Sequence, residues 1–395
     1  MRGSLDPRLQ PRECSARLRP MKRLFRHIRR SVLTVATALV ALSSTVVRAE
    51  PPADILDLTH ASAKAVVALQ SAVTPDLMKW PDVLGTAVGF SEAGHPALVV
   101  FVDWDGASHA DVVRALPPTL RGIAVRAELT DTFHALVGKP GGGQGGISHS
   151  AEQTPPIQLG TSGGWRDDLA NGYCCGGTLG SLVQVNGVQY ILSNYHVLEA
   201  DIVGGGNNLI ASTGNPIIQP GLIDASCNAN NAQIVGTLVK ISSLPHSNVD
   251  ASIAQVTQGM VRSDGAVLEI GPLSSQTVTA SLNQAVKKSG RTSGLTRSKV
   301  TGLNATIRVT YANECAGGTA FTKTFTGQIV ISNSGSKFLK SGDSGSLLVE
   351  DAGTRPRAAG LLYAGSSTSA IANPINEVLQ YIGGMLAGTA TMVGN

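Results

Sequence analysis

The sequence predicts a mostly β protein in which a double antiparallel β-barrel follows a small α+β domain. From about residue 177 onward, short runs rich in β-branched residues alternate with clusters of Gly, Asn, Ser and Pro, the pattern of an antiparallel sandwich or barrel. The 395 residues include 45 Gly, whereas only 15% are charged and 4% are aromatic. This composition excludes a coiled coil or a disordered chain, since both need many charges.

The strands expected in this part are short, and turn residues separate them. They lie at residues 178–185, 189–193, 233–241, 251–256, 277–280, 306–311, 327–331, 346–349 and 358–363, with one helix expected at 375–386. The length of this part suits two small barrels packed together. We therefore assign residues 165–395 to one barrel domain.

The first 49 residues have the layout of a secretory signal peptide. A basic segment at 22–30 precedes an uncharged apolar run at 31–47, and Val47-Arg48-Ala49 offers a cleavage site. Met21 is the expected start. The alternative is a membrane anchor, because the run reaches the lower limit of the ~17–25 residues that span a bilayer. We expect cleavage, and so a secreted or periplasmic protein without stable membrane insertion.

The net charge of +4 comes from this leader. Residues 1–49 hold 11 Lys and Arg against 2 Asp and Glu, which leaves 20 basic and 25 acidic residues in the rest of the chain. Nucleic-acid binding depends mainly on basic side chains that neutralise phosphates. The composition therefore argues against a nucleic-acid partner.

Residues 50–137 are expected to form the small α+β domain. Helices are expected at 55–73 and 107–116, and strands at 85–90, 96–102 and 122–129. Residues 138–164 lack periodicity and are rich in Gly, Ser and Pro, so they are expected to be a linker. The domain is either a prosegment or a permanent accessory module, and no segment of it has the sequence of an evident substrate mimic.

Four cysteines remain after the leader: Cys174, Cys175, Cys227 and Cys315. An even number in an exported chain predicts disulfides, with three possible connectivities. The adjacent Cys174 and Cys175 are expected to pair with different partners. No C-x-x-C pair is present, which disfavours zinc, and no metal site is predicted.

Three segments carry residues suited to nucleophilic catalysis. His196 ends an apolar strand, Asp250 begins another, and Ser344 lies between Gly342-Asp343 and Gly345. A serine hydroxyl is a poor nucleophile until an imidazole takes its proton, and a buried carboxylate must orient that imidazole. Each residue alone is more simply a turn or capping residue. Their joint occurrence, in the order His, Asp, Ser within an all-β region, indicates a triad.

This region resembles the trypsin-like serine peptidases of the chymotrypsin fold, in particular their bacterial secreted and periplasmic branch. The resemblance lies in Gly342-Asp343-Ser344-Gly345-Ser346 and in Ile191-Leu192-Ser193-Asn194-Tyr195-His196-Val197. It implies that Ser344 is the nucleophile, His196 the base and Asp250 the orienting acid. The backbone N–H groups of Gly342 and Ser344 would form the oxyanion hole. Tyr363-Ala364-Gly365 would pair with the main chain of a polypeptide substrate.

The resemblance predicts an exported serine endopeptidase that needs no cofactor. The alternative is a non-catalytic binding or scaffold protein that keeps the peptidase fold. Asp201 and Asp224 are rival acids, but Asp250 matches the acid-bearing strand best. The chain lacks the family's Ile/Val-rich terminus, whose amine stabilises the nucleophile loop, so Asp343 needs another partner. Phe338 and its neighbours offer no clear acidic residue that would bind a basic side chain, so specificity for Arg or Lys is not predicted. The oligomeric state is not predicted either.

Overall fold

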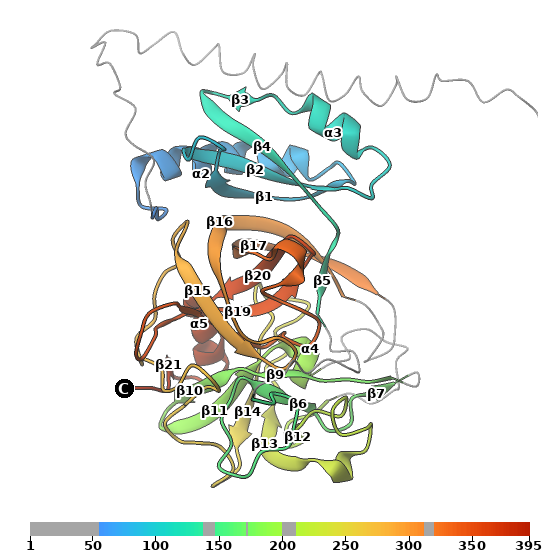
Figure 1. Ribbon diagram of the computed structural model, residues 1–395, viewed down its shortest axis with the longest axis vertical. Helices are drawn as coiled ribbons and strands as arrows, with labels where there is room; N and C mark the ends of the chain where they lie inside the picture. The colour runs from blue at the N-terminus through green and yellow to red at the C-terminus, as the bar shows by residue number, and fades with distance from the viewer. Residues whose placement is uncertain (1–54, 137–146, 171–172, 200–210, 312–319) are drawn as a thin grey trace, which may run out of the picture.

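The computed structural model describes residues 55–136, 147–170, 173–199, 211–311 and 320–395. The predicted leader of residues 1–49 lies outside these ranges. The predicted fold class is confirmed: the chain is mostly β, with two curled antiparallel sheets that form a chymotrypsin-like double barrel below a small α+β unit (Figure 1).

The first barrel is an eight-stranded sheet in the order β21-β10-β11-β14-β13-β12-β6-β9. Its strands are β6 (Thr161–Trp165), β9 (Gly177–Leu179), β10 (Ser181–Val185), β11 (Val188–Ser193), β12 (Pro216–Gln219), β13 (Gln233–Val239), β14 (Ser252–Val256) and β21 (Ala390–Met392). The short strands β7 (Leu169–Ala170) and β8 (Tyr173–Cys174) form a separate ribbon. Inward-facing aliphatic side chains such as Leu182, Ile191 and Leu238 fill the barrel.

The second barrel closes because its first strand pairs with two others. Strand β15 pairs with both β16 and β18 in the path β15-β18-β19-β20-β17-β16. The strands are β15 (Ala285–Gly290), β16 (Gly294–Tyr311), β17 (Phe321–Ser332), β18 (Leu347–Glu350), β19 (Ala358–Gly365) and β20 (Ser369–Pro374), and helix α5 (Ile375–Met385) follows.

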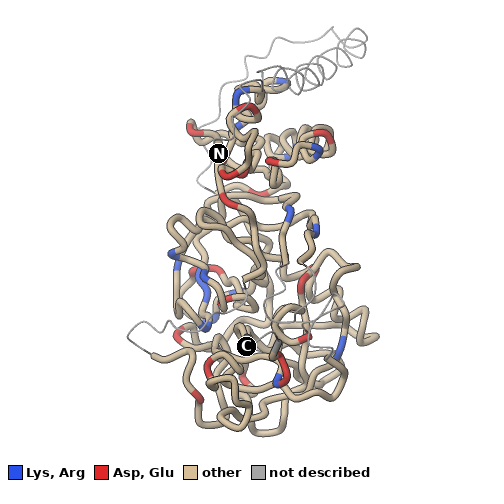
Figure 2. The backbone as a smooth tube through the Cα atoms, turned by 90° about the vertical axis from the view of Figure 1, so that its right-hand side faces the viewer, with Lys and Arg blue, Asp and Glu red and all other residues tan. Residues whose placement is uncertain are grey.

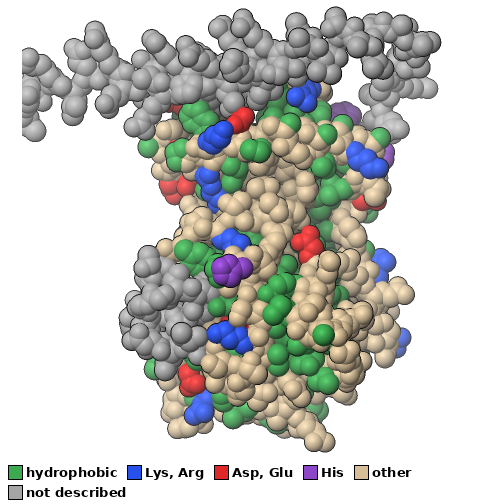
Figure 3. Space-filling view, turned by 180° about the vertical axis from the view of Figure 1, so that it is seen from behind, with side chains coloured by type: hydrophobic (Ala, Val, Ile, Leu, Met, Phe, Trp, Pro, Cys, Tyr) green, Lys and Arg blue, Asp and Glu red, His purple; other side chains and the backbone are tan. Residues whose placement is uncertain are grey.

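The α+β unit continues the sheet of the second barrel. Its elements are α2 (Ala61–Leu77), β1 (Val83–Phe90), β2 (Pro96–Asp103), α3 (His109–Ala115), β3 (Thr119–Leu120), β4 (Ile123–Thr130) and β5 (Phe133–Ala135). Strand β1 pairs antiparallel with β16, Gly85 opposite Ile307. Seen from behind, the unit meets the barrels at a narrower waist (Figure 3). Strand β16 thus belongs to both bodies.

Three expectations differ from the structure in detail. The predicted linker reaches residue 164, yet Ile157 and Leu159 are fully buried and Thr161–Trp165 forms β6. These few apolar residues among Gly, Ser and Pro make no visible period, so only the tertiary pairing shows the strand. Residues 277–280 make a single bridge, from Thr277 to Ala358, in place of a strand. The first helix lies at Ala61–Leu77, several residues later than expected.

Within the described residues, the disulfide pairing and the distribution of charged residues agree with the expectations from the sequence. Cys174 is bonded to Cys227, and Cys175 is also in a disulfide, so the adjacent cysteines have different partners. Cys315 lies outside the described residues. Lys and Arg are distributed among Asp and Glu along the described chain (Figure 2). None of the described helices is both long and apolar enough to span a membrane.

We expect Gly85→Ala to weaken the junction between the two bodies. A Cβ atom at Gly85 would lie 2.3 Å from the Thr306 carbonyl oxygen, which is backbone and yields little. Such overpacking costs about 1–3 kcal/mol. The control is Gly384→Ala, at an exposed helical position where the Cβ meets nothing within 4 Å. Thermal unfolding should show a lower midpoint for Gly85→Ala alone; equal midpoints would contradict this account.

Candidate active site

His196 lies on α4 (Tyr195–Leu198), the single turn that follows β11. The side chain is buried, and its Nδ1 lies 2.6 Å from Oδ2 of Asp250. A carboxylate only accepts hydrogen bonds, so Nδ1 of the neutral ring donates and Nε2 is left as an acceptor. Among the described residues Nε2 has no hydrogen-bond partner. The ring is therefore held in the tautomer that a general base needs.

Asp250 is fully buried and fixed on all sides, just before β14. Its Oδ1 accepts from the Tyr195 amide at 2.7 Å, and its Oδ2 accepts from the Tyr311 hydroxyl at 2.8 Å. Its own amide donates to Oδ1 of Asn373 at 2.9 Å. Burial, together with the nearby carboxylate, raises the pKa of Tyr311 well above its usual value, so this hydroxyl stays protonated and donates.

Of the two rival acids, the structure describes Asp224, which is bonded to another residue than His196. Asp224 instead accepts two hydrogen bonds from the Arg291 guanidinium, at 2.6 and 2.7 Å. Asp201 lies outside the described residues. The arrangement agrees with the choice of Asp250 from its place at the start of a strand.

Ser344 lies in a turn between β17 and β18 that depends on its two glycine neighbours. Gly342 and Gly345 both have φ +91°, a conformation that L side chains rarely adopt. The Ser344 hydroxyl donates to the Tyr363 carbonyl at 3.2 Å. The Ser344 carbonyl accepts from the Thr178 amide at 2.8 Å. The turn is thus bonded both to β19 of its own barrel and to the first barrel.

A further contact ties the serine turn to the histidine strand. The Ser193 hydroxyl, three residues before His196, donates to the Thr178 carbonyl at 2.7 Å. Tyr311 lies with its ring 5.9 Å from that of His196 and also belongs to the apolar cluster that contains Tyr363. These contacts bring the three predicted triad residues to one junction between the barrels.

Asp343 has the partner that the sequence leaves open. Its carboxylate lies 3.1 Å from Nζ of Lys288 on β15, and both side chains are fully buried. It also accepts from the amides of Thr292 and Lys340, each at 2.9 Å. Burial alone would raise the pKa of Asp343, but the Lys288 charge and the hydrogen bonds, including that of Ser293, hold it below its usual value. An internal lysine thus takes the place of a terminal amine.

The predicted substrate-binding face is already covered by the chain itself. Strand β5 pairs antiparallel with β19, Ala135 opposite Ala364 and His134 opposite Gly365. The Gly342 amide, predicted for the oxyanion hole, donates to the Leu136 carbonyl at 3.0 Å. Accordingly Ser344, Tyr363 and Ala364 have no exposed surface.

Sequence reasoning did not identify Tyr311, Asn373, Lys288 or Leu136. Tyr311 and Asn373 lie at the ends of long or paired strands and carry no local motif. Lys288 had no local signal, because it directly follows another lysine, Lys287. Leu136 had none, because its role depends on pairing between segments more than 200 residues apart.

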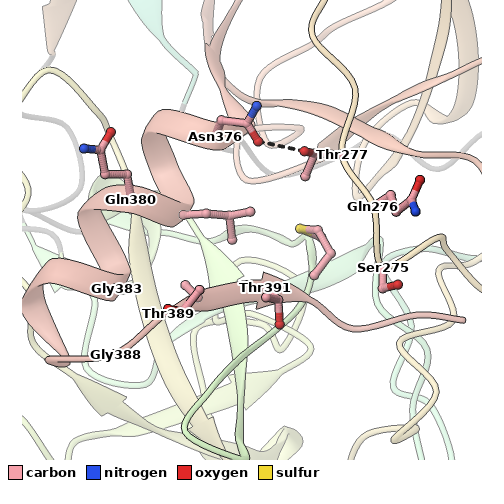
Figure 4. Close-up of a pocket in the computed structure, with 12 residues that line it drawn as sticks. Ser275, Gln276, Thr277, Asn376, Gln380, Gly383, Gly388, Thr389 and Thr391 are labelled. Atoms are coloured by element: carbon pink, nitrogen blue, oxygen red, sulfur yellow. Dashed lines mark hydrogen bonds between the residues drawn. The ribbon is translucent and has the colours of Figure 1, made fainter.

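A surface pocket of about 670 Å³ lies elsewhere, between α5 and β21 (Figure 4). Polar side chains such as Thr277, Asn376 and Gln380 line it, and the Thr277 hydroxyl donates to Asn376 at 2.7 Å. None of the three triad residues contributes to its wall. We do not associate it with the candidate chemistry.

Comparison with known families gives one match inside the barrel domain. Residues 241–373 match the family model described as the Nal1 C-terminal domain, which is not a peptidase family model. The match spans about a third of the chain and includes Asp250 and Ser344 but not His196. A comparison with curated proteins found no match.

Among solved structures, the chain is similar to several bacterial serine proteases. Examples are a glutamic acid-specific serine protease (20% identity, TM-score 0.37, 60% of this chain and 100% of that one), Thermobifida fusca protease A (17%, 0.38, 60% and 99%) and Cellulomonas bogoriensis chymotrypsin (20%, 0.35, 60% and 99%). These scores are low.

Replacing Lys288 by Met should destabilise the protein by about 3–5 kcal/mol, because it leaves the Asp343 charge buried without its partner. Lys299→Met, at an exposed position on the adjoining strand, is the control and should have little effect. Urea unfolding at neutral pH measures the free energy of unfolding of each variant against that of the wild type.

The ion pair between Lys288 and Asp343 also predicts how the free energy of unfolding changes with pH. A carboxyl whose folded pKa is depressed stabilises the fold above its unfolded pKa of about 3.9 and loses that contribution as pH falls through the folded value. In Lys288→Met, protonation of Asp343 removes the unpaired charge. Because burial without Lys288 raises the pKa of Asp343, the gap between the two proteins should begin to narrow above about pH 4 and should narrow further below it, as the wild type loses its own contribution; a gap independent of pH would contradict the ion-pair account.

Proposed function

We propose that the protein is an exported serine endopeptidase that cleaves polypeptides through an acyl-enzyme. The observation that carries the proposal is the buried chain of contacts from Tyr311 through Asp250 to His196, which leaves Nε2 free to accept a proton. The serine turn lies at the same junction. The predicted leader at residues 1–49 and the disulfides support export to a secreted or periplasmic location.

In the proposed reaction, Oγ of Ser344 attacks the scissile carbonyl while Nε2 of His196 takes its proton. Asp250 holds the ring and stabilises the imidazolium that forms. The Gly342 and Ser344 amides stabilise the negative oxygen. His196 then protonates the leaving amine, and water releases the acyl group by the reverse sequence. No metal or organic cofactor takes part in this scheme.

The alternative, a non-catalytic binding or scaffold protein, has one observation in its favour. The Ser344 hydroxyl donates to Tyr363 and makes no hydrogen bond with Nε2 of His196. Rotation about the single Cα–Cβ bond of Ser344 redirects this hydroxyl, and catalytic hydrogen bonds commonly tighten only when substrate is bound. We therefore favour the enzyme.

Ser344→Ala should abolish covalent labelling by a fluorophosphonate probe and hydrolysis of peptides, with the fold unchanged. Only the contribution of binding and the oxyanion hole remains when a triad member is lost. The control is Ser334→Ala, at an exposed position ten residues earlier, which should label normally. Because Leu136 covers Ser344, labelling is followed until it is complete. Failure of the folded wild-type protein to label would favour the scaffold.

Asp250→Asn should lower kcat by about 10,000-fold, because the amide N–H₂ would face Nδ1 and select the wrong tautomer of His196. Tyr311→Phe removes one neutral donor to the same charged oxygen, a net loss of about 1.5–3 kcal/mol or roughly 10- to 150-fold. Steady-state kinetics on one peptide substrate compares both. If the two variants lost activity equally, Asp250 would not be the orienting acid.

A further inference from the structure

The turn from β15 to β16 carries a buried arginine that the proposed mechanism does not use. Arg291 is 3% exposed, and its Nε and Nη2 donate to the two carboxylate oxygens of Asp224, at 2.7 and 2.6 Å. Asp224 lies between β12 and β13 of the first barrel and also accepts from the Ser162 hydroxyl on β6 at 2.6 Å. A bidentate pair of this kind fixes the plane of the guanidinium. The pair therefore connects the two barrels and sets the direction of Nη1.

This third nitrogen determines how one hydroxyl group points. Nη1 of Arg291 donates to Oγ1 of Thr292 at 3.1 Å. A guanidinium can only donate, so the Thr292 hydroxyl accepts from it and keeps its own proton for another acceptor. That acceptor is the Ser341 carbonyl, at 2.6 Å. The order of donors and acceptors thus runs from Arg291 through Thr292 to Ser341.

The Ser341 carbonyl and the Gly342 amide belong to one peptide unit. Because the unit is planar and trans, its C=O and N–H groups point in opposite directions. A contact that fixes the Ser341 oxygen therefore also fixes the direction of the Gly342 N–H, one of the two donors proposed for the oxyanion hole. In the structure this N–H donates to a carbonyl oxygen, that of Leu136, at 3.0 Å. Rotation of this single peptide unit would break both contacts.

The other peptide unit of Gly342 is held from the first barrel. The Gly342 carbonyl accepts from Oγ1 of Thr178 at 2.9 Å, and the same hydroxyl accepts from the Arg291 amide at 3.0 Å. A Cβ atom at Gly342 would lie 2.6 Å from Oγ1 of Thr292 and 2.9 Å from Nη1 of Arg291. The arginine turn thus packs directly against a glycine whose backbone is otherwise the least restricted of any residue.

We propose that Arg291, held by Asp224, is a positioning residue for the Gly342 N–H in the oxyanion hole, an inference that rests on the proposed function. Arg291 acts through the Thr292 hydroxyl and does not touch the substrate. Asp224, a rival of Asp250 in the sequence, thereby serves the oxyanion hole and not the histidine. The negative oxygen forms only in the transition state, so loss of this orientation lowers kcat and leaves KM nearly unchanged.

Two substitutions at Thr292 test the last step of this path in the full chain. Thr292→Val removes the hydroxyl, whereas Thr292→Ser keeps it, and neither changes the Thr292 amide that donates to Asp343. On a peptide substrate, kcat of Thr292→Val should fall at least about tenfold, less than the ~100- to 1,000-fold loss that follows deletion of an oxyanion donor. KM should change less than about threefold. Thr292→Ser should recover most of the lost activity, and Thr324→Val, at an exposed position on β17, is the control that should match the wild type.

Arg291→Lys tests the guanidinium itself. A lysine ammonium keeps the charge but cannot bind both oxygens of Asp224 and the Thr292 hydroxyl in one plane, so kcat should fall by a factor similar to that of Thr292→Val. If Arg291 acts through Thr292, the double variant should lose no more than about threefold beyond the larger single loss, because contacts in one network are not additive. Two losses that multiply would overturn the path through Thr292.

A merely structural role predicts a different result. Looser packing would lower the thermal midpoint of Thr292→Val and the fraction of molecules that a fluorophosphonate probe labels at Ser344. The rate per labelled site would then stay at the wild-type value. Labelling is followed until it is complete, so that slower reaction is not counted as lost sites, and the hydrolysis rate is divided by the concentration of labelled sites. An unchanged rate per site in Thr292→Val would overturn the inference.

Failure of the inference and failure of the proposed function are distinguishable. If the wild type hydrolyses peptides through Ser344 while Thr292→Val and Arg291→Lys keep its kcat, the inference is overturned and the proposed function stands. A folded wild-type protein that neither labels nor hydrolyses peptides overturns both.

Discussion

The buried ion pair between Lys288 and Asp343 is the contact on which the geometry of the candidate active site depends. Asp343 stands between Gly342, whose amide donates to the Leu136 carbonyl, and Ser344. Because its carboxylate is fixed by Lys288 and by the amides of Thr292 and Lys340, both neighbours are fixed with it. A lone charge in this position would be strongly destabilising, so the loop keeps one conformation as long as the pair is intact.

The cation that holds Asp343 is internal to the chain. Lys288 lies on β15, so the order of the serine turn does not depend on a chain terminus. Access to this turn is closed by β5, which pairs with β19, and by Leu136, whose carbonyl accepts from the Gly342 amide.

The sequence predicted what local chemistry determines. The double barrel followed from short strands and turn residues. The candidate site residues were chosen from three short motifs, such as the two glycines around Ser344, and their roles stay predictions. It could not predict Lys288, because a buried cation is recognised only when its partner is known. Nor could it predict that Ile157 and Leu159 belong to the core, or that Leu136 reaches Gly342, since these follow from pairings distant in sequence. The domain boundaries at residues 137 and 164 remain predictions, although β6 (Thr161–Trp165) runs across residue 164.

The length of β16 explains how the α+β unit can set the position of the Leu136 carbonyl. This strand of 18 residues pairs with β15 and β17 in the barrel and with β1 in the α+β unit. A slip of one residue in the β1–β16 register would reverse the faces of every side chain in β1, so the register is strongly specified. Gln70 adds to it by donating to the Asn304 carbonyl at 2.8 Å. The unit that carries β5 is therefore held in a fixed position above the candidate site.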